Sequence, residues 1–135
     1  MSTKAREVVF EVVFASRFTG SIDLGLKAAL FKNEKLNKED TDYAERVLAL
    51  IGEHEAEFAE IIDKRSLAFP ETRLFPADKS ILFVALAEIK YMDDIPAVVS
   101  VNEAANIASK FSSPKSASFI SGILADVIKE RICIR

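Results

Sequence analysis

The stretch YAERVLALIGEHEAEFAEI, residues 43–61, decides the fold class. Six of its side chains recur at steps of four, four, three, four and three residues: Tyr43, Val47, Ile51, His54, Phe58 and Ile61. This spacing places them along one stripe of an α-helix. Asn37 precedes the stripe as a capping residue, and the pattern continues to about Arg65. The stretch therefore predicts a long helix with one buried face.

Five further segments on either side of this stretch also have helical patterns. We expect helices over residues 3–18, 22–32, 78–91, 96–111 and from 114 toward the end. Gly and Pro number only four each in 135 residues, which is too few turn formers for a sandwich, barrel or propeller. Pro70 and Pro76 bracket the main interruption. The sequence therefore predicts an all-α fold in one domain, residues 1–135, with lobes over 1–70 and 71–135.

The helix expected over residues 78–91 contains ILFVALA, residues 81–87, which is apolar on nearly every side. A helix of this kind lies at the centre of a bundle or is covered by a partner. At seven residues, this longest apolar run is far short of the ~18 needed to span a membrane. We therefore expect a soluble, cytoplasmic protein.

The composition limits the class of function. Lys and Arg number 18 against 21 Asp and Glu, a net charge of −3, which argues against a strongly basic nucleic-acid binder. Charge is uneven, however, because the first 32 residues carry five basic and three acidic side chains. The single Cys and single His exclude an internal disulfide and a zinc site built from Cys and His alone. A lone thiol at Cys133 fits a reducing cytoplasm.

Catalytic candidates are weak. His54 lies on the apolar stripe and is interpreted as a packed or boundary residue, since no nucleophile stands beside it. Asp93 and Asp94 precede Ile95-Pro96 and are interpreted as turn formers. No glycine-rich phosphate loop is present. We therefore expect no enzyme activity, no cofactor and no metal.

Two segments have the features of an anion site. Lys4 and Arg6 lie at the positive end of the first helix, and Ser113, Lys115 and Ser116 surround the start of the last one. Either segment is open to a simpler interpretation. The first also fits an ordinary solvated terminus, and the second fits simple helix capping.

The second half of the chain carries a specific motif. It begins at Asp94-Ile95-Pro96 and ends at Leu124, with these residues between: Val99, Val101, Asn102, Glu103, Ala104, Ala108, Lys110, Phe111, Ser116, Phe119 and Gly122. This pattern resembles the NusB family of bacterial transcription antitermination factors. Looser matches in the first half, such as Arg6-Glu7 and Gly52, extend the resemblance over nearly the whole chain.

The resemblance implies a fold of two small three-helix bundles packed together. It also implies that the protein binds the boxA element of ribosomal RNA transcripts together with NusE, a protein of the small ribosomal subunit, and helps RNA polymerase read through terminators. The basic N-terminal stretch that contacts RNA in the family is reduced here to Lys4 and Arg6, with Arg17 further along. We expect RNA contacts from these three residues, with Ser113 and Lys115 adding to them.

The NusE partner is expected on the outer surface around the helix over 78–91. Glu88 matches the family there, and Tyr91 lies about one turn further on, so the two are expected to share an exposed face. Apolar surface on the same helix would support a homodimer. We expect Asn102 and Glu103 to tie the next helix to the preceding turn.

Two alternative functions remain open at this point. The thinned basic segment and net charge of −3 fit a protein-interaction module with little RNA binding. NusB-like modules also occur fused to RNA cytosine methyltransferases, so the chain could be an accessory to an rRNA methyltransferase acting in trans.

Overall fold

A computed structural model describes residues 3–66 and 74–134, with side chains described as far as Glu130. Within these residues six α-helices form and no strand does. They are α1 (Thr3–Thr19), α2 (Leu24–Asn33), α3 (Lys38–Arg65), α4 (Pro76–Tyr91), α5 (Ala97–Phe111) and α6 (Pro114–Ile134). The all-α prediction is confirmed. Among the described residues, no helix is long and apolar enough to cross a membrane.

The predicted helix ends are close to the observed ones. The Asn37 side chain accepts a hydrogen bond of 2.8 Å from the Asp40 N–H, which confirms it as the cap of α3. Two starts differ from prediction: α2 begins two residues later, at Leu24, and α4 begins two residues earlier, at Pro76. Proline fits the first position of a helix because no intrahelical partner exists there for an N–H.

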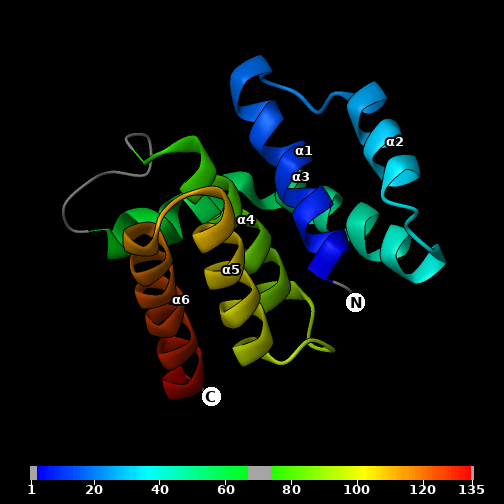
Figure 1. The fold of residues 1–135 in the computed structure, drawn as a ribbon. Coiled ribbons are helices and arrows are strands. Elements are labelled where there is room, and N and C mark those ends of the chain that lie inside the picture. Colours follow the sequence, from blue (N-terminus) through cyan, green and yellow to red (C-terminus); the bar gives the residue numbers. More distant parts are fainter. Residues whose placement is uncertain (1–2, 67–73, 135) are drawn as a thin grey trace.

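Helix α4 lies at the centre of the molecule (Figure 1). It packs against α1, α3, α5 and α6, and every residue from 80 to 89 is buried. The prediction of a central helix is therefore confirmed. The expectation of apolar surface on α4 for a homodimer is wrong, because neighbouring helices already cover those side chains.

The three C-terminal helices pack against one another, and α4 also joins α1 and α3. The buried apolar side chains form one continuous core through α1, α3, α4, α5 and α6. Helix α2 contributes no buried residue and stands beside α1 at the edge (Figure 1). The boundary expected at Pro70 lies outside the described residues, so the two-lobe division stays a prediction.

Helix α3 departs from ideal geometry at His54, where φ is −120° and ψ is 19°. The His54 ring stacks on the Tyr91 ring at a centroid distance of 4.1 Å. Its side chain is about one quarter exposed, so the interpretation as a boundary residue is confirmed. The kink thus lies where α3 meets the end of α4.

Candidate nucleic-acid interface

Arg6 and Glu88 were expected at two different surfaces, and the structure buries both in one ion pair. The Arg6 side chain is 4% exposed and that of Glu88 is 1% exposed. Arg6 Nε and Nη2 donate to the Glu88 carboxylate at 2.9 and 3.0 Å. The expectation that Glu88 shares an exposed face with Tyr91 is wrong, and Arg6 does not present its guanidinium to solvent.

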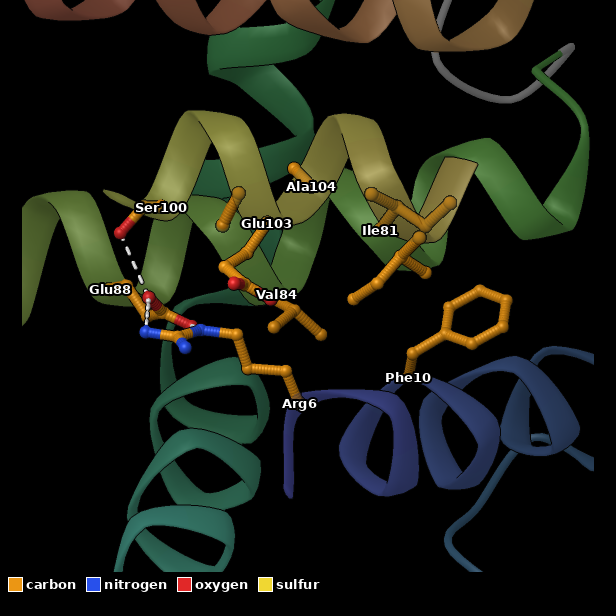
Figure 2. A pocket seen from close by; sticks show the side chains of 10 residues that line it. Arg6, Phe10, Ile81, Val84, Glu88, Ser100, Glu103 and Ala104 are labelled. Atoms are coloured by element: carbon orange, nitrogen blue, oxygen red, sulfur yellow. Dashed lines mark hydrogen bonds and ion pairs between the residues drawn. The ribbon is translucent and has the colours of Figure 1, made fainter. Parts of the chain in front are cut away.

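Two further donors complete this buried cluster. The Tyr43 hydroxyl donates to Glu88, and the Ser100 hydroxyl donates to Glu88 Oε1 at 2.8 Å. Figure 2 shows Arg6 reaching up from α1 to Glu88, which Ser100 joins from α5. The cluster therefore ties α1, α3, α4 and α5 together.

Burial and charge act together on the acid–base groups of this cluster. Burial by itself lowers the pKa of the Arg6 guanidinium, but the hydrogen bonds and charge of Glu88 outweigh it and raise that pKa. Burial raises the pKa of the Tyr43 hydroxyl well above its usual value, and the Glu88 charge adds to the effect. Arg6 is therefore charged and Tyr43 neutral at physiological pH. The sequence held one signal of this site, since Glu88 interrupts an otherwise apolar buried run.

A small cavity of about 10 Å³ adjoins the Arg6–Glu88 pair (Figure 2). It is lined by Arg6, Phe10, Ile81, Val84, Ala85, Glu88, Ser100, Glu103, Ala104 and Ile107. Such a volume admits about one water molecule and no organic cofactor. Among the described residues, no group of three His, Cys, Asp or Glu side chains could hold a metal ion.

Arg17 lies near the other end of α1, about 20 Å from Lys4 at the rise of a helix. Its Nη2 donates to Glu55 at 2.7 Å, and its guanidinium lies 5.4 Å from the centroid of the buried Phe83 ring. It lines a cleft of about 180 Å³ between α1 and α3. The structure therefore does not bring Arg17 together with Lys4.

Tyr91 faces α3. Its ring stacks on His54, and its hydroxyl donates to Glu57. That hydrogen bond raises the pKa of the Tyr91 hydroxyl. The side chain is half-buried and does not lie on an outer face with Glu88.

The start of α6 has an internal carboxylate beside it. The Ser113 hydroxyl accepts a hydrogen bond from the Ser116 N–H at 3.0 Å. This is the bond that a helix cap makes, so the simpler of the two interpretations holds for Ser113. The buried Asp78 carboxylate accepts from the Ser112 and Ser116 hydroxyls at 3.0 and 2.9 Å. Lys115 is exposed beside this cluster. Because Asp78 brings its own negative charge here, the start of α6 is less suited to a phosphate than its sequence indicated.

Four phenylalanine rings form a feature that the sequence reasoning missed. The rings of Phe10, Phe14 and Phe18 follow one another along α1 at 5.8 and 5.1 Å, and Phe111 of α5 lies 5.1 Å from Phe10. We call these four residues the aromatic strip. Phe10 is buried, whereas Phe18 is 67% and Phe111 38% exposed. The spacing of Phe10, Phe14 and Phe18 at four-residue steps along α1 could have predicted that their rings lie side by side.

A lysine accompanies the exposed ring of Phe111. Lys110 Nζ lies 5.3 Å from the Phe111 ring centroid and donates to Glu7 Oε1 at 2.9 Å. Exposed aromatic rings stack on bases, and lysines beside them contact phosphates. The end of α5 against α1 therefore has the chemistry of a single-stranded nucleic-acid contact.

Comparison with known proteins points to one family. The NusB family model matches residues 3–129. The transcription antitermination protein NusB of Agathobacter rectalis is 35% identical over 125 residues, covering 91% of this chain and 95% of that protein. The T. maritima NusB structure superposes with a TM-score of 0.87 at 26% identity, covering 96% of this chain and 92% of that one.

A second solved structure shares the fold at lower identity. It is a crystal structure of the antitermination factors NusB and NusE in complex with dsRNA. It matches with a TM-score of 0.84 at 20% identity, over 95% of this chain and 96% of that one. Since the family match spans nearly all of the sequence and the fold agrees with it, the chain belongs to the NusB family.

Proposed function

We propose that this chain is a non-enzymatic transcription antitermination protein that binds boxA-type RNA together with NusE in the cytoplasm. Its relatives carry the name transcription antitermination protein NusB, and a structural neighbour is held in a complex with NusE and dsRNA. One observation on this chain supports the proposal most directly. It is the exposed Phe111 ring with Lys110 beside it.

We assign the RNA to the seam between α1 and the end of α5. Bases stack on Phe111 and Phe18, while Lys4, Lys110 and Lys115 contact phosphates. Arg6 supports this surface from beneath through Glu88 and does not contact RNA. The RNA contacts proposed on α1 are therefore Lys4 and Phe18, with a rigidly held helix behind them.

We assign NusE to the end of α4 and the start of α5. Val98 is 63% and Val99 36% exposed there, and half-buried Tyr91 lies nearby at the end of α4. This surface carries uncovered apolar side chains, as the centre of a protein interface requires. The chain then binds RNA at one surface and NusE at another, and two weak contacts together give a strong assembly. RNA polymerase carries this assembly through terminators.

Fluorescence anisotropy with labelled boxA RNA tests the proposal, with purified NusE present or absent. We expect weak RNA binding by the chain alone and much tighter binding when NusE is added. Phe111→Ala should weaken binding, since base–aromatic stacking contributes about 1–3 kcal/mol per base. Leu24→Ala is the matched control, because Leu24 is also an exposed apolar residue, at 69%, but lies on α2. Absence of RNA binding even with NusE would refute the proposal.

A further inference from the structure

Lys110 is the lysine beside the exposed ring of Phe111, yet its charge is already engaged. Its side chain is 60% exposed, and Nζ lies 2.9 Å from Glu7 Oε1. The hydrogen bond to Glu7 and the Glu7 charge raise the pKa of Lys110, and Glu11 and Glu34 act in the same direction. Glu7 therefore contacts the lysine beside the stacking ring, and the charges of Glu11 and Glu34 also act on that lysine.

These carboxylates share a region of negative potential. Partial burial raises the pKa of Glu11, and the charges of Glu34 and Glu7 raise it further. A phosphate that approaches Lys110 must displace the Glu7 carboxylate or lie close to it. Displacement loses an ion pair and proximity brings like charges together, so both reduce the free energy gained on binding.

From this geometry we infer that Glu7 restrains RNA binding by holding Lys110, so that the wild-type chain binds RNA less tightly than its own surface allows. The inference rests on the proposed function. It names Lys110 as a phosphate contact and Glu7 as the residue that limits this contact. Removing the Glu7 charge should strengthen the contact of Lys110 with the RNA.

The place of α1 beside Lys110 is fixed by contacts of the residues around Glu7. Arg6, the preceding residue, is locked to Glu88 at 2.9 Å, and Thr3 Oγ1 donates to Glu103 of α5 at 3.2 Å. On the C-terminal side of Glu7, the ring centroids of Phe10 and Phe111 lie 5.1 Å apart. These contacts hold α1 against α5, so Glu7 remains beside Lys110 when the helix surface meets its ligand.

The test compares Glu7→Gln with the wild-type chain. Anisotropy titrations use labelled boxA RNA with NusE at several salt concentrations. We expect Glu7→Gln to lower Kd by about twofold to fivefold, the range of an exposed ion pair. We also expect the slope of log affinity against log salt to steepen by less than about 0.7, the value for one full phosphate contact, since Lys110 already makes part of that contact in the wild-type chain.

Two controls separate this restraint from a general charge effect. Lys110→Gln should weaken binding, and adding Glu7→Gln to it should give little further gain, because no cation remains to be released. Glu45→Gln removes the same charge from the Lys27–Glu45 pair, which is 2.8 Å long and joins α2 to α3. It should leave Kd and the salt slope unchanged.

The outcomes distinguish the inference from the proposed function. Unchanged or weaker RNA binding by Glu7→Gln, with normal binding by the wild-type chain, overturns the inference alone. An equal gain from Glu7→Gln in the Lys110→Gln background also overturns it. Absence of RNA binding by the wild-type chain with NusE overturns the proposed function, and the inference with it.

Discussion

Two adjacent residues of α1 form ion pairs of the same length in opposite surroundings. Arg6 meets Glu88 of α4 at 2.9 Å with both side chains almost fully buried. Glu7 meets Lys110 of α5 at 2.9 Å with side chains 21% and 60% exposed. Distance alone therefore says little about what an ion pair contributes.

The two pairs also differ in the number of partners. The Glu88 carboxylate accepts from Arg6, Tyr43 and Ser100, so its charge is matched by donors on three other helices. Water competes for the Glu7 and Lys110 charges, and salt screens them. The first pair should therefore hold the fold, whereas the second can be exchanged for a ligand.

Removing one member of the buried pair should have the largest effect. Glu88→Leu leaves the Arg6 charge buried without a counter-charge, which costs about 3–5 kcal/mol. Urea unfolding followed by circular dichroism measures the loss. The double variant Arg6→Met with Glu88→Leu should recover most of it, because no charge is then buried. If Glu88→Leu alone were at least as stable toward urea as the double variant, this account would be contradicted.

Arg6→Lys should have the next largest effect. A lysine keeps the charge but cannot make two parallel hydrogen bonds to one carboxylate. We expect a loss of about 2 kcal/mol in the free energy of unfolding. The salt slope of RNA binding should stay at the wild-type value, since Arg6 does not contact phosphate. A slope reduced to that of Lys110→Gln would show that Arg6 reaches the RNA.

Tyr43→Phe should cost about 1.5 kcal/mol at neutral pH, because a hydrogen bond to the charged Glu88 is lost while the ring remains. The pKa of Tyr43 is raised in the folded state, so the folded chain holds this proton more tightly than the unfolded chain. The Tyr43 contribution is therefore complete below pH 10.0, the usual pKa of a tyrosine hydroxyl, and is lost as pH rises above it.

The alkaline loss can be followed by urea midpoints between neutral pH and about pH 11. The wild-type chain should lose more stability over this range than Tyr43→Phe does. Tyr91→Phe is the comparison variant, since Tyr91 is half-buried at the end of α4, where it faces α3, and its loss leaves the Arg6 cluster intact. If the urea midpoints of the wild-type chain and Tyr43→Phe fell equally with rising pH, the Tyr43 hydroxyl would not be buried as described.

Much of the fold followed from sequence because the signals are local. The signals are the stripe from Tyr43 to Ile61, the Asn37 cap and the prolines at the first positions of α4 and α6, and each acts within one or two helical turns. The central place of α4 followed from its apolar run. These features require no knowledge of which helices meet.

The site followed less well because its contacts join distant segments. Arg6 and Glu88 are 82 positions apart, and Glu7 and Lys110 are 103 apart. A charged residue looks the same in sequence whether it is exposed or neutralised by a remote partner. The sequence therefore placed Arg6 and Glu88 on the surface, and it gave no sign that Asp78 would approach the serines at the start of α6.

Glu7→Gln should have the smallest effect on folding. The Lys110 side chain is largely exposed, so water replaces the lost contact and the urea midpoint should match that of the wild-type chain. Glu45→Gln, at a similarly exposed pair, should behave alike. A loss as large as that of Arg6→Lys would show that the seam between α1 and α5 depends on Glu7, and any change in RNA affinity would then follow from the fold. An unchanged midpoint with tighter RNA binding instead means that Lys110 can be released to a ligand while Arg6 keeps the helix in place.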